Sequence, residues 1–341
     1  MYNPKITIKG EEFNSRNTLV IAEMANAHDG NVEIAKKIIK ASADGGANAV
    51  KVQRILADEI SVPGYSYYEI LKKCEMPIDE WKGLVEYAKD LGLMVFADVF
   101  GETSLADMEQ FNLDAYEIHS SDITNSILIK KVAETGKPVF LYVGGASLDD
   151  AEYAVAKAKE YGATEIAIMH GFQNFPTKLE DTNLERIRMI QEKFGLPVGY
   201  AGHLDGDDEL AVPYPLMPMG MNAVIMEKHI TWDRSQKGVD YQSSLNPDEF
   251  KKFVEYVRRV EKSLGSKEYV LNDGEKEYRK LVRKHILAQK DLKAGDEIKI
   301  DDIHLKRVEK DLPFLRVEEV VGKTAARDVP KNEVIVEDML K

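Results

Sequence analysis

Short, mostly apolar runs alternate with amphipathic stretches along the first 264 residues of the chain. The runs are rich in Val, Ile, Leu, Phe and Tyr, a pattern typical of strands that are buried on both faces of a parallel sheet. We therefore expect eight buried parallel strands. They span residues 18–23, 48–53, 93–98, 115–120, 138–143, 165–170, 197–203 and 222–229.

The stretches between these runs have the spacing of amphipathic helices, most clearly over residues 32–43, 79–91, 149–161 and 247–264. Ser147 is a plausible N-cap for the third of these helices. Several glycines stand just before the strand-like runs, where a helix C-cap is expected. These glycines are Gly45, Gly92, Gly136, Gly162 and Gly195.

Eight alternating strand–helix units predict a closed (β/α)8 barrel, the TIM barrel fold, over residues 1–264. An open doubly wound sheet is the alternative. No GxGxxG motif follows the first strand-like run, and this weakens the dinucleotide-binding version of the open sheet. The barrel is the preferred interpretation.

The pattern changes after residue 264. Residues 265–280 are polar and are interpreted as a linker, and residues 281–341 contain short strand-like pieces separated by Gly and Asp turns. About 60 residues cannot hold a large core. We expect a small β-rich C-terminal domain.

Composition narrows the function classes. The chain has 46 basic and 59 acidic residues, a net charge of −13, which argues against binding to nucleic acid or to an anionic membrane surface. The single Cys74 allows no internal disulfide and suits a reducing compartment. No signal-peptide pattern and no apolar run of about 20 residues is seen. We expect a cytoplasmic protein that acts on small molecules.

Active-site residues of such a barrel come from the carboxyl ends of its strands. Those ends carry Glu23, Lys51, Gln53, Asp98, Glu117–Ser120, Tyr142, His170, His203 and Glu227–His229. Four of the seven histidines lie there. His203 and His229 end the seventh and eighth strands, so their imidazoles should converge on one point, as a metal site requires. Mn²⁺, Zn²⁺, Fe²⁺ or Co²⁺ would suit them, with Glu23 or Asp240 as possible oxygen ligands.

Lys51 lies inside an apolar strand, where a lysine is costly to bury unless it is paired. It could bind a charged substrate or form a Schiff base, or it could form a structural ion pair with Glu23. Glu23 itself is a candidate acid or base. Residues 143–147 (VGGAS) resemble a loose phosphate loop, although a plain turn is at least as good an interpretation.

Four segments carry a resemblance to a known family. They are residues 21–53 (IAEMANAHDG…NAVKVQ), 227–250 (EKHITWDRSQKGVDYQSSLNPDEF), 285–307 (HILAQKDLKAGDEIKIDDIHLKR) and 322–335 (GKTAARDVPKNEVI). The first two resemble the sialic acid (N-acetylneuraminate) synthases and their pseudaminic and legionaminic acid relatives. The last two resemble the antifreeze-like domain that ends these enzymes, and this domain would span residues 281–341.

The resemblance implies a reaction and a set of roles. Phosphoenolpyruvate would condense with the open-chain aldehyde of an N-acetylated amino sugar, with a Mn²⁺-class ion on the aldehyde oxygen. By motif position, His203 and His229 would bind the metal, Glu23 would be the acid or base, Lys51 and Gln53 would bind the donor, and Asp240 the sugar. The enzymes of this family are domain-swapped dimers, and Arg307 would reach the partner's site.

Several site positions depart from the family pattern. Asp98 stands in a stretch that is usually rich in Ser and Thr and contacts phosphate. Glu117 replaces a donor-binding lysine, although Ser120 is kept. Gln173 and Phe175 replace an Asn and a Tyr.

At a few ångströms and an effective dielectric near 20, each unit of charge changes an interaction by up to about 4 kcal/mol. Asp98 and Glu117 should therefore disfavour a phosphate unless Lys51, Lys228 or a second cation compensates. Three hypotheses stay open: a synthase that uses phosphoenolpyruvate, a metal-dependent aldolase or lyase with a donor such as pyruvate, and a catalytically silent sugar-binding homologue.

Overall fold

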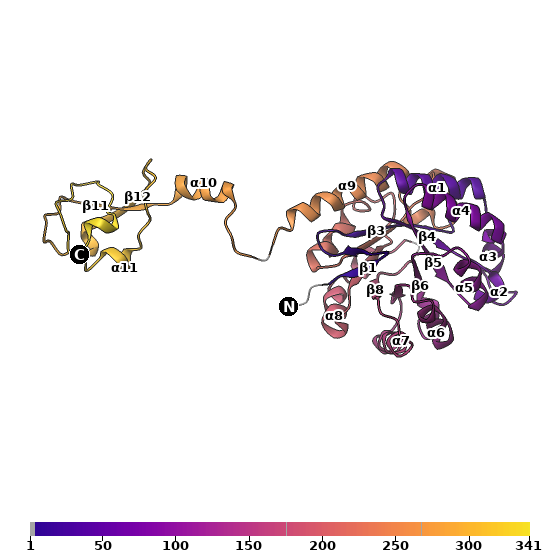
Figure 1. Cartoon of the computed structure of the whole chain (residues 1–341). Helices are drawn as coiled ribbons and strands as arrows, with labels where there is room; N and C mark the ends of the chain where they lie inside the picture. Colours follow the sequence, from indigo (N-terminus) through magenta and orange to yellow (C-terminus); the bar gives the residue numbers. More distant parts are fainter. Residues whose placement is uncertain (1–3, 175, 267) are drawn as a thin grey trace. The chain divides into compact units, whose positions relative to one another are not determined.

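Eight parallel strands close into a barrel, so the prediction of a (β/α)8 TIM barrel is confirmed (Figure 1). The computed structural model describes residues 4–174, 176–266 and 268–341. The strands follow one another around the barrel in chain order, and the last pairs with the first. They are β3 (Leu19–Ala25), β4 (Ala49–Gln53), β5 (Met94–Val99), β6 (Ala115–Ile118), β7 (Val139–Tyr142), β8 (Ile166–His170), β9 (Val198–Gly202) and β10 (Ile225–His229).

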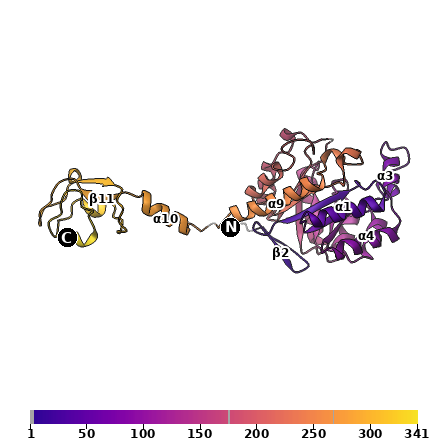
Figure 2. The same cartoon turned by 90° about the horizontal axis from the view of Figure 1, so that it is seen from above.

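Helices form a layer outside the strands (Figure 1). The long ones are α1 (Val32–Asp44), α4 (Ile78–Asp90), α5 (Glu102–Glu109), α6 (Ser126–Glu134), α7 (Leu148–Glu160), α8 (Glu185–Phe194) and α9 (Pro247–Ser263). Two short helices, α2 (Ala57–Ile60) and α3 (Tyr68–Cys74), lie in the loop after β4. Helix α1 packs between α4 and α9 (Figure 2).

One crossover lacks an α-helix. Between β9 and β10 the chain forms the 3-10 helix η3 (Tyr214–Met221). Pro213 precedes it, and Pro215 and Pro218 lie within it. Because proline has no N–H to donate and clashes with the preceding turn, this spacing prevents a regular α-helix.

The period of two along each strand divides the barrel core into an outer and an inner layer. On β3, for example, Val20 and Ala22 pack in the outer layer, whereas Leu19 and Ile21 belong to the inner one. Glu23 continues the inner series at the carboxyl end of the strand. The same alternation directs Lys51, Asp98, Glu117 and Glu227 into the barrel mouth.

A hairpin of β1 (Ile6–Ile8) and β2 (Glu11–Phe13) precedes the barrel. Its apolar residues Ile6, Ile8 and Phe13 join the inner core layer. The backbone N–H of Thr7 donates to the Glu165 carboxylate at 3.0 Å, just before β8. The hairpin thus packs at the amino ends of the strands, on the side away from the expected site. The sequence analysis did not anticipate it.

By internal contacts the chain divides into two compact units, Met1–Gly265 and Ser266–Lys341. The second unit has the antiparallel strands β11 (His285–Ala288) and β12 (Ile303–Lys306), the short helix α11 (Val317–Val320) and its own small apolar core. Part of the predicted linker is helical, as α10 (Asp273–Val282). A capping box of Asn272 and Glu275 begins α10, a signal that was present in the sequence.

No helix among the described residues is both long and apolar enough to cross a membrane.

Candidate active site

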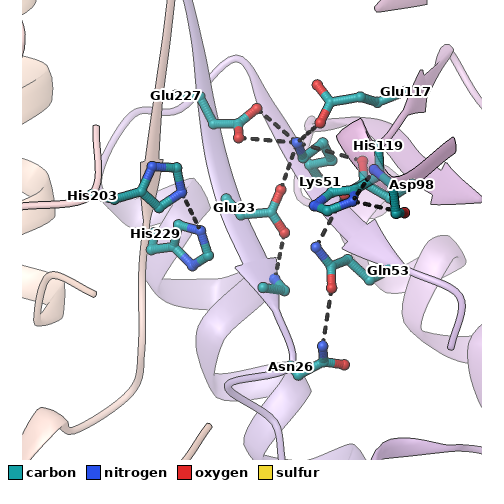
Figure 3. A network of polar contacts seen from close by, with 12 residues as sticks. Glu23, Asn26, Lys51, Gln53, Asp98, Glu117, His119, His203, Glu227 and His229 are labelled. Atoms are coloured by element: carbon teal, nitrogen blue, oxygen red, sulfur yellow. Dashed lines mark hydrogen bonds and ion pairs between the residues drawn. The ribbon is translucent and has the colours of Figure 1, made fainter. Parts of the chain in front are cut away.

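The carboxyl ends of the barrel strands surround a cavity of about 340 Å³. Most of the predicted site residues line it (Figure 3). Asp240 lies beside the cavity, bonded to the lining residue Gln173, and Arg307 belongs to the second unit. The lining consists of Glu23, Lys51, Gln53, Asp98, Glu117, His119, Ser120, Tyr142, Gly144, Gly145, Phe172, Gln173, His203, Glu227 and His229.

Four carboxylates surround the ammonium group of Lys51 (Figure 3). Its Nζ lies 2.6 Å from Glu117 Oε1, 2.9 Å from Glu23 Oε2, 2.9 Å from Glu227 Oε2 and 3.4 Å from Asp98 Oδ1. All five side chains are almost fully buried. The ion pair of Glu23 with Lys51, one of the alternatives from the sequence, is therefore present within a larger cluster.

The cluster has a formal charge of −3 if all five groups are ionised. This excess of negative charge affects the pKa values of its members. Burial alone would lower the pKa of Lys51, but the surrounding carboxylates outweigh it and hold that pKa above its usual value. Burial raises the pKa of Glu117 well above its usual value; the charge of Lys51 opposes this shift, and the charges of Asp98 and Glu227 add to it. Lys51 is therefore a firmly protonated cation, which makes a Schiff base at this residue a poor interpretation.

Hydrogen bonds fix two carboxylates of the cluster, Asp98 on β5 and Glu23 on β3. The amide of Gln53 donates to Asp98 Oδ2 at 3.0 Å and accepts from Asn26 Nδ2 at 3.0 Å. Glu23 Oε1 accepts the backbone N–H of Ala25 at 2.6 Å, where an irregularity in the β3–β4 pairing turns that N–H back toward the site. Asp98 and Glu23 are thereby held in place beside Lys51.

The two predicted metal ligands face each other (Figure 3). Their Nε2 atoms are 3.2 Å apart, and both imidazoles are buried. The Nδ1 of His203 lies 3.0 Å from the carbonyl oxygen of Ala201, so it donates and leaves the Nε2 lone pair directed at His229. Burial lowers the pKa of His203 to about 3 and that of His229 well below its usual value. Both rings are therefore neutral, the form that binds metals.

This pair fits a divalent ion. Two nitrogen ligands at about 2.1 Å from one ion, nearly at right angles, are separated by roughly 3 Å, close to the distance seen here. In the described part of the chain, no group of three or more His, Cys, Asp and Glu side chains is arranged to hold a metal. Glu23 is bonded to Lys51 and Ala25, and Asp240 to Gln173. Water or substrate would have to complete the coordination.

Gln173 lines the cavity and holds Asp240 beside it. Gln173 Nε2 donates to Asp240 Oδ1 at 3.1 Å. Burial raises the pKa of Asp240, against the hydrogen bonds from Gln173 and from the backbone of Asn26. An amide and a carboxylate together can bind neighbouring sugar hydroxyls. Phe175, the other departure in this loop, lies outside the described residues.

Two residues at strand ends do not face the cavity. Lys228 points to the outer side of β10, where its Nζ donates to the carbonyl oxygens of Gly202 at 3.0 Å and Ser243 at 2.9 Å. The ring of His170 contacts the carbonyl oxygen of Thr182 at 3.0 Å. Lys228 is thus not placed to compensate the charge of a substrate phosphate, one of the options raised by the sequence.

Glu227, Tyr142, His119 and Phe172 line the cavity without having been assigned a role from the sequence. Glu227 stands two residues before His229 on β10, so the period of two already put both on one face. The rings of His119 and Tyr142 stack with centroids 5.6 Å apart. Their contact joins β6 to β7, and no local pattern in the sequence indicates it.

Glycines allow the loops after β7 and β8 to close around the cavity. A Cβ on Gly144 would lie 1.8 Å from the carbonyl oxygen of Gly171. Gly171 has a φ of 134°, and a Cβ there would lie 2.1 Å from the carbonyl oxygen of Ala201. Because backbone atoms cannot move aside easily, only glycine fits at these two positions.

Comparison with known proteins matches the chain to two family models. The model of the NeuB family matches residues 38–269, and that of the SAF domain matches residues 284–341. An uncharacterized protein of Methanocaldococcus jannaschii is 31% identical over 95% of this chain and 94% of its own length. The N,N'-diacetyllegionaminic acid synthase of Campylobacter jejuni is 28% identical over 94% of this chain and 100% of its own length.

A solved structure shows the same similarity. The N-acetylneuraminic acid (sialic acid) synthetase of Leptospira borgpetersenii superposes with a TM-score of 0.76 at 28% identity. The match covers 82% of this chain and 98% of that structure.

Proposed function

The chain belongs to the NeuB family, and we propose that it joins a three-carbon donor to the open-chain aldehyde of an amino sugar, giving a nonulosonic-type acid. The observation that carries the proposal is the facing pair of His203 and His229 at the mouth of a barrel, 3.2 Å apart. Relatives named as legionaminic, pseudaminic and N-acetylneuraminate-9-phosphate synthases match 93–94% of this chain, and their names support the proposal.

The proposal includes a divalent metal ion, Mn²⁺ in the first place and Co²⁺, Fe²⁺ or Zn²⁺ as alternatives. His203 and His229 would hold it through their Nε2 atoms. The fit of their separation and their neutral state support this assignment. A bound ion would supply Lewis-acid polarisation of the aldehyde oxygen.

The chain's own residues account for binding and positioning. Asp240 and Gln173 would bind hydroxyl groups of the acceptor sugar, since they offer both an acceptor and donors at the edge of the cavity. Glu23 is the candidate for proton transfer, and the N–H of Ala25 fixes one of its oxygens. Lys51 would hold the surrounding carboxylates in one arrangement rather than react itself.

The quaternary arrangement also belongs to the proposal. We expect a cytoplasmic, domain-swapped homodimer in which Arg307 of the SAF domain completes the site of the partner chain. The support is the SAF match at residues 284–341 together with the resemblance of the segment that carries Arg307.

The test is formation of a 2-oxo sugar acid by the purified full-length protein. It would be incubated with Mn²⁺, a panel of N-acetylated amino sugars and either phosphoenolpyruvate or pyruvate, and the product detected by mass spectrometry. Product with at least one acceptor is expected. Absence of both product and bound metal would instead favour the catalytically silent homologue.

A matched pair of variants tests the metal site. His203→Ala together with His229→Ala should reduce bound metal from about one ion per chain to nearly none and reduce the rate at least a hundredfold. His304→Ala, a histidine of β12 in the second unit, should keep its metal. Normal metal content in the double variant would overturn the assignment of the ligands.

A further inference from the structure

One buried lysine has no role in the proposed reaction so far. Lys228 is fully buried on the outer side of β10, and it does not line the cavity. Its Nζ donates to two backbone carbonyl oxygens, that of Gly202 at 3.0 Å and that of Ser243 at 2.9 Å. Removing an ammonium group from water is costly, so these two hydrogen bonds have to compensate for its lost hydration.

The acidic residues that act on Lys228 through the chain or through their charge are paired elsewhere. Glu227, its neighbour on β10, points to the other face of the strand and is bonded to Lys51 at 2.9 Å. Glu249 is bonded to Arg234 at 2.9 Å. Lys228 is therefore held by backbone oxygens, and its charge serves to bind two separate pieces of main chain.

The first of these pieces carries a proposed metal ligand. Gly202 is the last residue of β9, opposite Lys228 in the parallel pairing of β9 with β10, and His203 follows it directly. The ring of His203 is oriented by its own Nδ1, which lies 3.0 Å from the carbonyl oxygen of Ala201. Lys228 thus holds the peptide unit from which His203 extends.

The second piece is the loop after β10. Ser243 is buried at the end of the 3-10 helix η5 (Tyr241–Ser243). While its carbonyl oxygen accepts from Lys228, its hydroxyl donates to the carbonyl oxygen of His203 at 3.1 Å. The contacts close a ring that runs from Lys228 to Gly202, along the chain to His203, across to Ser243 and back to Lys228.

The same loop carries the proposed sugar-binding carboxylate. Asp240 directly precedes η5, and its carbonyl oxygen accepts the backbone N–H of Ser243 at 3.2 Å and the hydroxyl of Ser244 at 2.8 Å. Asp240 has a φ of 61°, in the left-handed region that is unfavourable for residues other than glycine. Its backbone therefore depends on these contacts, and its position follows that of Ser243.

We propose that Lys228 is a positioning residue, whose buried ammonium group fixes His203 relative to the loop that carries Asp240. The metal-binding end of the site and its sugar-binding end are thereby held in one frame. The inference rests on the proposed function, because it concerns how that same site is aligned. Lys228 itself contacts neither end through a reacting atom.

Replacing Lys228 by methionine removes the hydrogen bonds and keeps most of the volume. Lys228→Met leaves the carbonyl oxygens of Gly202 and Ser243 buried without this donor, so both peptide units should turn toward other partners. Other contacts keep the loop folded, because Arg234 Nη1 donates to the carbonyl oxygen of Ser244 at 3.1 Å. The variant should therefore shift the loop rather than unfold the barrel.

Metal affinity is the first measurement. The metal-free full-length protein would be titrated with Mn²⁺ in a calorimeter, and Lys228→Met should bind the ion roughly tenfold more weakly, as is common when a group that orients a ligand is removed. Lys251→Met, at an exposed lysine of α9, is the matched control and should bind as the wild type does. The melting temperature shows whether each variant is folded.

A double-mutant cycle tests the ring itself. Ser243→Ala removes the hydroxyl that binds His203 and keeps the carbonyl that binds Lys228. If both residues act through one ring, the losses of Mn²⁺ affinity in the two single variants should not add in the double variant. Additive losses would mean that Lys228 and Ser243 act separately, and would overturn the ring as the device.

Steady-state kinetics checks the sugar-binding end. Lys228→Met should raise the KM for the acceptor sugar roughly tenfold and change the KM for the donor less than about twofold, because the displaced loop carries Asp240. A loss of folded protein alone would lower the apparent kcat and leave both KM values unchanged.

The ring nitrogens of the histidines give a measurement that needs neither metal nor substrate. In the wild type, Nδ1 of His203 faces the carbonyl oxygen of Ala201, and its Nε2 faces His229 at 3.2 Å. With ¹⁵N-labelled histidine, Lys228→Met should shift the NMR signals of the His203 ring, which His203→Ala assigns. Lys251→Met should leave these signals in place.

The outcomes separate this inference from the proposed function. Wild-type Mn²⁺ affinity, KM values and histidine signals in folded Lys228→Met overturn the inference and leave the proposed function intact. A lower melting temperature with those three quantities unchanged overturns it too, since Lys228 would then only stabilise the fold. If the wild type binds no Mn²⁺ and gives no product, the proposed function fails, while the histidine signals still decide whether Lys228 positions His203.

Discussion

At the scale of single residues, neighbours rather than residue type decide what a charged side chain does. Lys51 was expected to bind a donor, yet four carboxylates already occupy its surroundings. Glu117 was noted as a charge reversal, and it now forms the shortest contact of Lys51, at 2.6 Å. Such a cluster is costly to break, because removing one partner leaves uncompensated buried charge.

Removal of Lys51 should therefore destabilise the fold. Lys51→Met leaves Glu23, Asp98, Glu117 and Glu227 without their cation, and we expect a loss of about 3–5 kcal/mol in the free energy of unfolding. Denaturant titration measures it. Lys130→Met, at an exposed lysine of α6, is the control and should change stability by less than about 0.5 kcal/mol. Equal effects of the two substitutions would contradict the structural role of Lys51.

The loss should depend on pH in a defined direction. The pKa of Glu117 is raised in the folded protein, so its contribution to stability is greatest below its unfolded value of about 4.5 and falls as the pH rises. Without Lys51 this trend should steepen. Lys51→Met should thus be least damaging, relative to wild type, near pH 4–5. A penalty that grows toward acid pH would refute this electrostatic explanation.

Asp240 gives a prediction for substrate binding. Its carboxylate is paired with Gln173, so Asp240→Asn should raise the KM for the acceptor sugar roughly tenfold and change the KM for the donor little. Steady-state kinetics with each substrate varied in turn checks this. Asp248→Asn, exposed in the first turn of α9, serves as the matched control. An effect confined to the donor would place Asp240 at the other end of the site.

At the scale of elements, the strand ends present the chemistry and the loops after them shape the cavity. The inner residues of β3, β4, β5, β6 and β10 supply the cluster around Lys51, while β10 and the residue that follows β9 supply the histidine pair. The close approach of the loops after β7 and β8 then depends on Gly144 and Gly171.

A pair of glycine substitutions tests the loop contact. Gly171→Ala forces a Cβ against the carbonyl oxygen of Ala201 at a φ of 134°, and should cost more than about 2 kcal/mol of stability. Gly83→Ala is the control, since this exposed glycine of α4 has no atom within 4 Å of an added Cβ and should gain about 0.5–1 kcal/mol. Thermal unfolding compares the two. A tolerated Gly171→Ala would mean that the loops can separate.

At the scale of the whole molecule, the proposed sharing of a site between chains has a direct test. If Arg307 serves the partner's barrel, mixed dimers of His203→Ala and Arg307→Ala chains contain one complete site. Refolding the two inactive variants together should restore roughly a quarter of the wild-type activity, as expected for random pairing of the two chains. Lys310→Ala, from the same segment, should be active alone. Inactivity of the mixture would argue that each chain uses its own Arg307.

The sequence by itself determined the barrel, the face on which its side chains act and the convergence of His203 and His229. These follow from local regularities: the period of two along strands, the period of helices between them, and the rule that strand ends carry the site. His203 and His229 were recognisable because each ends a strand and the two strands are neighbours. The change of pattern after residue 264 predicted the second domain, and the family segments indicated its type.

Only the tertiary structure decided which groups meet inside the barrel. Glu227 reaches Lys51 because closure pairs β10 with β3, beside β4, and Asp98 and Glu117 reach it from the other side. Strand stagger and side-chain length set those distances, and neither leaves a periodic signal in the chain. The sequence placed a lysine and four acids at strand ends. Their convergence, which surrounds Lys51 with four carboxylates within 3.4 Å, is a property of the closed barrel.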